Sequence, residues 1–138
     1  MKIPVIRGVI DRRVLVNYRV DPRALSRVLP PMFRPKKIRG FAMAGICLIR
    51  LANIRPRFLP SWFGISSENA AHRFAVEWGE AEGVKSGVFI QRRDTNSLLN
   101  AWAGGRLFPG VHHHAQFVVS ESSEQISIGV RSDDGAID

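Results

Sequence analysis

The stretch from Gly87 to Gln116 constrains the fold of this chain more than any other segment. It opens with an apolar run, Gly87 to Ile90, which is typical of a strand buried on both faces. The pair Asp94-Thr95 predicts a helix N-cap, and a loose stripe of apolar residues at helical spacing follows it. A Phe-Pro-Gly sequence ends that helix, and Val111 to Val119 predicts a second strand. We therefore expect a strand, a helix and a strand at the centre of the fold.

The rest of the chain reads mainly as strands joined by polar turns. Asp21 and Pro22 predict the start of a helix of about two turns, because aspartate caps a helix and proline fits its first position. Apolar content and alternation predict further strands at residues 14–20, 40–52, 70–80 and 125–130.

Two loops carry structural expectations. The loop from Asn53 to Ile65 contains Phe58, Trp62 and Phe63, and we expect it to pack down over the domain because exposed aromatic clusters are unusual. Near the other end, residues 132–135 predict a hairpin turn, and the chain stops before the returning strand is complete. A hairpin without its second arm leaves backbone groups unpaired, so we expect the chain to be a piece of a longer protein.

A chain of 138 residues with 45% hydrophobic and 23% charged residues predicts one globular domain, residues 1–138. Cys47 is the single cysteine, and its apolar neighbours indicate a buried, inert thiol. We see neither a signal peptide nor an apolar stretch as long as a membrane span, so we expect a cytoplasmic protein without a membrane partner. Whether the protein forms a homo-oligomer stays open.

The positive charge of the chain is concentrated in one segment. The formal net charge is +8, and residues 22–67 contain nine Arg or Lys and no Asp or Glu. Such a segment is suited to an acidic partner or an anionic ligand. The sequence argues against nucleic acid, because the segment lacks a regular aromatic interleave, a helix-turn-helix pattern and zinc-finger spacing.

Several short motifs, taken in order, resemble a known family. They are Asn17 to Pro22 with Leu25, Leu29-Pro30-Pro31, Gly40-Phe41-Ala42, Asn53-Ile54-Arg55-Pro56, Glu68-Asn69, Gly87-Val88-Phe89, and Ala101 to Pro109. Their order resembles that of the uncharacterised YqjF-like proteins (domain of unknown function 2071), which belong to the acetoacetate decarboxylase-like superfamily. The resemblance implies an α+β, mainly antiparallel β fold. It would be a cone-like β-barrel around an internal pocket, with short peripheral helices, and incomplete at the C-terminus if the chain is a piece.

The decarboxylase of that superfamily works through a lysine Schiff base, and a neighbouring lysine lowers the pKa of that amine. The central strand, helix and strand, where the family would place this nucleophile, contain no lysine; the four lysines of the chain are Lys2, Lys36, Lys37 and Lys85. The arginines of the central unit cannot replace it, because arginine stays protonated and forms no imine. We therefore expect no Schiff-base chemistry.

Five residues are candidates for the pocket. Glu68 matches the acidic residue that the family sets near the pocket and would act as an acid or base or orient a ligand. Arg106, at the end of the predicted helix, would hold a carboxylate bidentately. His112 and His114 share a face of the second strand and, with Trp102 of the helix, would contact the ligand. Each has a structural alternative: Glu68 would pair with an arginine, Arg106 would stabilise the helix end, Trp102 would lie in the core, and the histidines would pack or face solvent.

The triplet His112-His113-His114 also raises the question of a metal. Adjacent strand residues point to opposite faces, so at most His112 and His114 would share an ion, with His72 as a third ligand. No Cys-x-x-Cys or His-Glu-x-x-His motif accompanies them, and we expect neither a metal nor a cofactor. Arg92 and Arg93 are expected to flank the end of the first strand in solvent.

These observations predict a protein whose pocket binds a small, partly apolar carboxylate or carbonyl compound. The reaction is unknown, and Glu68 and Arg106 are the candidate catalytic residues. The alternative is a non-enzymatic interaction module whose basic segment, residues 22–67, binds an acidic partner. A metal-dependent enzyme is a third hypothesis.

Overall fold

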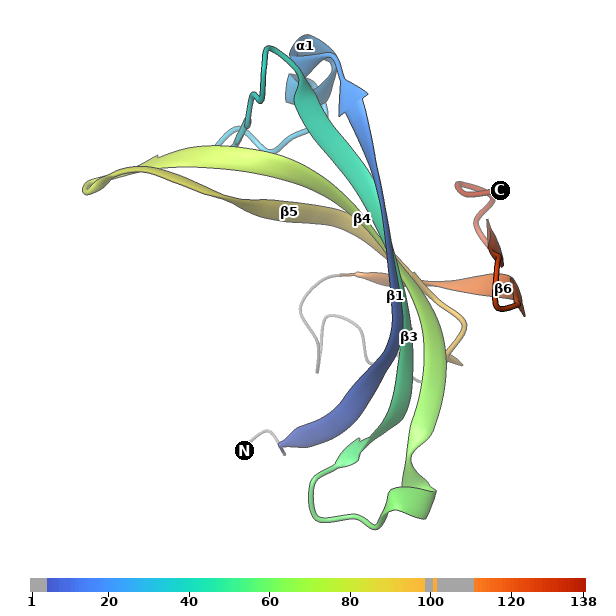
Figure 1. Ribbon diagram of the computed structural model, residues 1–138. Helices are drawn as coiled ribbons and strands as arrows, with labels where there is room; N and C mark the ends of the chain where they lie inside the picture. Colours follow the sequence, from blue (N-terminus) through green and yellow to red (C-terminus); the bar gives the residue numbers. More distant parts are fainter. Residues whose placement is uncertain (1–4, 99–100, 102–110) are drawn as a thin grey trace.

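A strongly bent, seven-stranded sheet makes up most of the protein, as the computed structural model shows (Figure 1). The structure describes residues 5–98, 101 and 111–138. Within those ranges the elements in chain order are β1 (Ile6–Val20), α1 (Pro22–Ser26), β2 (Arg34–Pro35), β3 (Ala42–Pro56), the 3-10 helix η1 (Ser61–Phe63), β4 (Ile65–Glu80), β5 (Gly83–Thr95), β6 (His112–Glu121) and β7 (Ile126–Ser132).

The strand order is β1-β3-β4-β5-β6-β7, with β2 paired to β4. All of these neighbours are antiparallel except β5 and β6, which pair in parallel over three residues. A parallel pair needs a long crossover, and the segment between Thr95 and His112 supplies it. The predicted fold class is confirmed: the described chain is mainly antiparallel β, curled like part of a barrel, with little helix.

The long strands exceed their predicted bounds. β1 begins eight residues before Val14, and β3 runs on to Pro56, because the two strands pair along almost their whole lengths. Local irregularities interrupt the pairing between Arg7 and Val9 and between Ile10 and Arg12. Such irregularities increase the local twist of a strand pair. Alternation in the sequence revealed only the regular part of each strand.

The first strand of the central unit differs from the prediction. β5 is not buried on both faces, since Val88 is 58% exposed. Asp94 and Thr95 are the fully buried end of β5 instead of a helix cap. The helical turn starts later, at Leu98, and the amide of Ala101 donates a hydrogen bond to the carbonyl of Ser97. Hydrogen bonding to β4 extends the strand past the point at which local cap preference would end it.

The helix α1 begins as predicted and seals one end of the sheet. The Asp21 carboxylate accepts a hydrogen bond from the Arg23 amide, and Pro22 occupies the first turn. Leu25 and Leu29 pack with Ala42 and Val76 in a buried apolar cluster, and the rings of Phe33, Trp78 and Phe89 lie against it. Among the described residues, no helix has the length and apolar character needed to cross a membrane.

The aromatic loop does not pack down over the domain, so this prediction is wrong. The side chains of Phe58, Trp62 and Phe63 are 77%, 79% and 57% exposed. The strands β3 and β4 carry the loop away from the sheet centre, to the far end of the molecule from α1 (Figure 1). No element of the described chain lies close enough there to cover the rings.

Candidate functional site

One row of side chains crosses the middle of the sheet on a single face. In strand register, Leu15 pairs with Cys47, Cys47 with Ala71, Ala71 with Arg93, and Arg93 with His112. Residues that are direct partners across a sheet project from the same face. The row therefore brings a thiol, a guanidinium and an imidazole from three strands onto one surface.

A cavity of about 310 Å³ opens on this face. Its wall is mostly apolar, because alternate residues of β3 and the start of β1 turn towards it: Ile6, Cys47, Ile49, Leu51 and Ile54. Asn69, Arg93 and His112 supply polar groups on the β4, β5 and β6 side, and Asp94, whose carboxylate is paired with His72 and Arg92, also borders the cavity. An apolar cavity with a few polar groups at one side is the usual form of a small-molecule site.

Arg93 is the unusual residue of this cavity. Its Nε atom is buried without a hydrogen-bond partner, and no carboxylate of the described chain forms an ion pair with its guanidinium. A partly buried cation without a counter-charge is costly, because it has given up water and gained no ionic partner. An anionic ligand is the group that would remove this cost.

Arg93 also borders a second hollow, of about 520 Å³, between the β5 arm and the segment that follows α1. Phe33, Trp78 and Val88 contribute to its wall. The guanidinium thus stands between two mainly apolar spaces. A ligand whose anionic end meets Arg93 has room for its apolar part in either.

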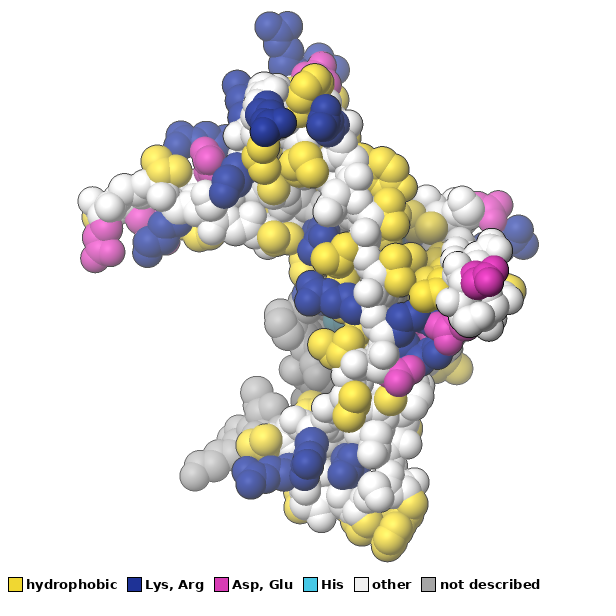
Figure 2. Space-filling model, in the orientation of Figure 1, with side chains coloured by type: hydrophobic (Ala, Val, Ile, Leu, Met, Phe, Trp, Pro, Cys, Tyr) yellow, Lys and Arg dark blue, Asp and Glu magenta, His cyan; other side chains and the backbone are white. Residues whose placement is uncertain are grey.

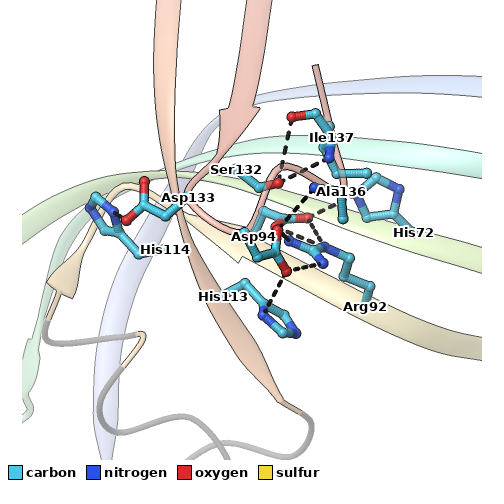
Figure 3. A network of polar contacts seen from close by, with 10 residues as sticks. His72, Arg92, Asp94, His113, His114, Ser132, Asp133, Ala136 and Ile137 are labelled. Atoms are coloured by element: carbon cyan, nitrogen blue, oxygen red, sulfur yellow. Dashed lines mark hydrogen bonds and ion pairs between the residues drawn. The ribbon is translucent and has the colours of Figure 1, made fainter.

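The opposite face of the sheet carries an ion-pair network centred on Asp94 (Figure 3). The Asp94 carboxylate is fully buried and lies 2.9 Å from Nε2 of His72 and 2.7 Å from Nη2 of Arg92. Arg92 in turn donates to both oxygens of Asp134 at 2.7 and 2.9 Å. His113 Nδ1 lies 3.4 Å from the same Asp134 carboxylate. The network ties the turn after β7 to the centre of the sheet.

The charged groups of this network shift one another's pKa. The hydrogen bonds from Arg92 hold the pKa of the Asp134 carboxyl below its ordinary value, and bonds from Ser132 and the Ala136 amide act in the same direction. Asp134 and Asp94 together raise the pKa of Arg92. Both groups are charged at neutral pH, so the network is a structural clamp.

A second network lies along β1, β3 and β4. The Glu68 carboxylate, 12% exposed, accepts from Arg12 Nη2 at 2.5 Å and from Arg50 Nε at 2.6 Å. Glu121 of β6 bridges the same two arginines, with 3.0 Å to Arg50 Nη1 and a contact to Arg12 Nη1. The hydrogen bond from Arg12 lowers the pKa of Glu121, and Arg50 lowers it further. Through these contacts β6 is held against the β1 and β3 strands.

The structure separates the residues that the sequence proposed as one site. His112 lines the cavity, whereas its neighbour in the chain, His113, belongs to the opposite face. Glu68 does not line the cavity, and its carboxylate lies in the arginine network. His114 pairs with Asp133, with Nδ1 to Oδ2 at 2.7 Å. Trp102 and Arg106 lie outside the described residues.

The expectation that Arg92 and Arg93 flank the strand end in solvent is wrong. The Arg92 side chain is 16% exposed and is held by two aspartates, and Arg93 lines the cavity. Their adjacency in a strand was the one available signal, because it sends one side chain to each face. This signal was easily missed, because two arginines before an aspartate are also typical of a strand end that faces solvent.

The described residues contain no group of three or more His, Cys, Asp or Glu that could hold a metal ion. The metal hypothesis placed His112 and His114 on one ion, with His72 as an optional third ligand. Instead His72 contacts Asp94, and His114 contacts Asp133. As for imine chemistry, the lysines within the described ranges, Lys36, Lys37 and Lys85, do not line the cavity. Lys85 is occupied in an ion pair with Glu80.

The comparisons with known proteins bear on the whole of this architecture. Residues 10–136 match the model of the family called domain of unknown function 2071, which is described as an uncharacterized conserved protein. Neither the search of curated proteins nor the search of solved structures found a match. The matched residues run from within β1 to the turn that follows β7. The chain therefore belongs to the family of domain of unknown function 2071.

Proposed function

We propose that this protein binds a small, partly apolar carboxylate or carbonyl compound in the cavity beside Arg93, as a pocket protein of the acetoacetate decarboxylase-like type without the Schiff-base lysine. The observation that carries the proposal is the Arg93 guanidinium, which lacks a carboxylate partner in the described chain and faces an apolar cavity. A guanidinium binds a carboxylate through two parallel hydrogen bonds, which fix both charge and orientation.

The size and lining of the cavity limit the ligand. A volume of about 310 Å³ is at the lower end of the range for small-molecule sites, roughly 300–1,000 Å³. The wall formed by Ile49, Leu51 and Ile54 favours an aliphatic or aryl body over a sugar or nucleotide. Asn69 and His112 add polar groups near the charged end. A short-chain or branched monocarboxylate or 2-keto acid fits this description.

Glu68 and His114, which the sequence placed beside His112, are not needed for this binding mode. We assign to Glu68 a structural role in the arginine network and keep His112 as a ligand contact. The proposal includes a cytoplasmic location, since Cys47 is a buried free thiol and thiols of this kind persist in a reducing compartment.

A thermal-shift screen of monocarboxylates and 2-keto acids against the protein, with the methyl ester of each acid beside it, tests the proposal. We expect acids to raise the melting temperature and esters to do so less, because the ester lacks the charge that Arg93 meets. In Arg93→Gln the affinity for a detected acid should fall about ten- to hundredfold, the equivalent of a lost charged hydrogen-bond pair. Arg131→Gln is the matched control: it is also a strand arginine, but its side chain is 71% exposed and pairs with Asp138.

The melting temperatures of the ligand-free proteins give a second test. Removing an unpaired, partly buried cation relieves a desolvation cost, so Arg93→Gln should melt at the same temperature as the parent or higher. Equal binding of acids by the parent and by Arg93→Gln would remove the assignment of the site. A screen in which no acid stabilises the parent would remove the proposed ligand class.

A further inference from the structure

The aromatic tip, residues 57–64 between β3 and β4, is an exposed apolar surface on an ordered loop. Its side chains include Phe58, Trp62 and Phe63, each more than half exposed. The rings of Trp62 and Phe63 lie side by side, with centroids 6.0 Å apart. Figure 2 shows this apolar patch at the lower end of the molecule, away from the apolar side chains around α1. Large aromatic side chains gathered at a protruding end mark a contact surface.

Hydrogen bonds hold the tip in one shape. Tight turns close it, with amides donating from Leu59 to the Pro56 carbonyl at 3.0 Å and from Gly64 to the Ser61 carbonyl at 3.1 Å. The Arg55 guanidinium donates to the carbonyl of Leu59 at 3.0 Å. Gly64 lies against Asn53 so closely that a Cβ would come within 1.9 Å of the Asn53 Oδ1 atom. The aromatic rings are therefore carried by a hydrogen-bonded loop, and the loop needs little further ordering when the rings bind a partner.

Arginines surround the base of the tip without acidic neighbours. Arg7 of β1 pairs in register with Arg55 of β3, and Arg57 follows two residues later. Residues 5–10 and 51–67, which form this end of the molecule, contain no Asp or Glu. The ion pairs found among the described residues include none with Arg7, Arg55 or Arg57. Figure 2 shows dark blue beside the yellow patch at this end, and no magenta.

We propose that the aromatic tip docks this protein on an anionic membrane surface, with its rings at the acyl boundary and Arg7 and Arg57 at the lipid phosphates. Tryptophan and phenylalanine favour that boundary, and arginines just behind them meet the phosphates. Cytoplasmic leaflets carry the anionic lipids that such a cationic base attracts. This peripheral contact differs from a membrane span, and it qualifies the expectation that the protein has no membrane partner.

Two other occupants fit the tip less well. A second copy of the chain would bring its own arginines against these arginines, and the charges would repel. An acidic protein, which the basic segment 22–67 had suggested as a partner, would pair with the arginines. Its charge alone would not explain the three exposed aromatic rings in front of them. In a bilayer surface the apolar layer lies beneath the anionic headgroups. The aromatic tip has the matching order, with its apolar rings at the end and its arginines behind them.

Co-sedimentation with phosphatidylcholine vesicles, with and without phosphatidylglycerol, tests the proposal on the full chain. We expect binding to the mixed vesicles that weakens with added salt, and much less binding to phosphatidylcholine alone. The double variant Phe58→Ser/Trp62→Ser and the double variant Arg7→Glu/Arg57→Glu should each lower the partition coefficient by at least about tenfold. Val118→Ser, at an exposed residue of β6, and Arg131→Glu are the matched controls and should bind as the parent does.

A fluorescence measurement separates insertion from simple charge attraction. Mixed vesicles should shift the tryptophan emission to the blue, and Trp62→Phe should abolish the shift while it keeps most of the binding. If Phe58→Ser/Trp62→Ser binds the mixed vesicles as the parent does, the rings are not the docking element and the proposal is overturned. Equal loss of binding to vesicles and to polyglutamate in the arginine variant, without a blue shift in the parent, would identify an acidic protein surface instead.

Discussion

Arg93 and His112 are direct partners in the parallel pairing of β5 with β6. This pairing places the guanidinium of Arg93 and the imidazole of His112 on one face of the sheet, although a long segment of the chain separates their two strands. Both side chains line a mainly apolar cavity of about 310 Å³. The next residues of the two strands, Asp94 and His113, are also register partners and belong to the other face. There Asp94 contacts His72, and His113 contacts Asp134. The strand pair thus separates Arg93, which has no carboxylate partner in the described chain, from the ionic network around Asp94.

Filling the cavity should block the ligand without touching Arg93. Ala71 lies between Cys47 and Arg93 and borders the cavity, so Ala71→Leu would place a larger side chain in the ligand's space. A clash of the size found for overpacked sites, about 1–3 kcal/mol, weakens binding roughly tenfold or more. Titration calorimetry with an acid found in the screen measures the change, and Ala75→Leu on the same strand is the control. Unchanged affinity in Ala71→Leu would place the apolar part of the ligand in the second hollow, beside Trp78.

The Glu68 carboxylate should matter for stability and not for the ligand. It lies between Arg12 and Arg50, and Glu68→Gln leaves these two arginines with the carboxylate of Glu121 and, for Arg50, that of Asp11 at 3.6 Å. Loss of one partner from a buried pair costs roughly 3–5 kcal/mol, and the remaining Glu121 should bring the cost to about 2–3 kcal/mol. Urea unfolding measures the loss, and calorimetry should show the parent's affinity for the acid. A variant of full stability and weakened binding would instead make Glu68 a residue of the site.

The fully buried Asp94 should be the most sensitive carboxylate of the second network. Asp94→Asn removes the charge that faces His72 and Arg92, and we expect a loss of about 3 kcal/mol or more in the free energy of unfolding, as for other broken buried pairs. Asp133→Asn is the matched change at an exposed pair with His114 and should cost less than about 1 kcal/mol. Urea unfolding of both variants measures the difference. Similar costs would mean that the Asp94 clamp contributes no more than a surface pair.

Acid should weaken the protein through carboxyls whose pKa is held low in the fold. Arg92 lowers the pKa of Asp134, and Arg12 lowers that of Glu121. The unfolded chain then takes up protons first, so this stabilisation is complete above the ordinary carboxyl pKa of about 4 and is lost as the pH falls through the lower folded values. Melting temperatures between about pH 7 and about pH 2 measure the loss. In Asp134→Asn the curve should be flatter on the acid side, and an equally steep curve would exclude Asp134 as a source.

Particular elements show how far the sequence could be read. The Asp21-Pro22 start of α1 and the turn at residues 132–135, in which the Gly135 amide donates to the Ser132 carbonyl at 3.0 Å, depend on neighbours in the chain and were predictable. Strands were predictable from alternation, which is local, and the resemblance to a known family implied their mainly antiparallel arrangement. The buried end of β5 was not. Asp94 and Thr95 are good cap residues by local preference, and hydrogen bonds to β4 keep them in a strand.

The candidate site shows the same division. Alternation alone determined that Arg92 and Arg93 point to opposite faces, and that His112 and His113 do the same. Which face holds the cavity was decided by the tertiary structure, through the register of β3, β4, β5 and β6, since those strands are far apart in the chain. The sequence by itself thus determined the strands, their two-sidedness and the positive charge. The pairing of distant strands decided that Arg92 has carboxylate partners and that Arg93 has none among the described residues, because a side chain's counter-charge is supplied by its neighbours in space.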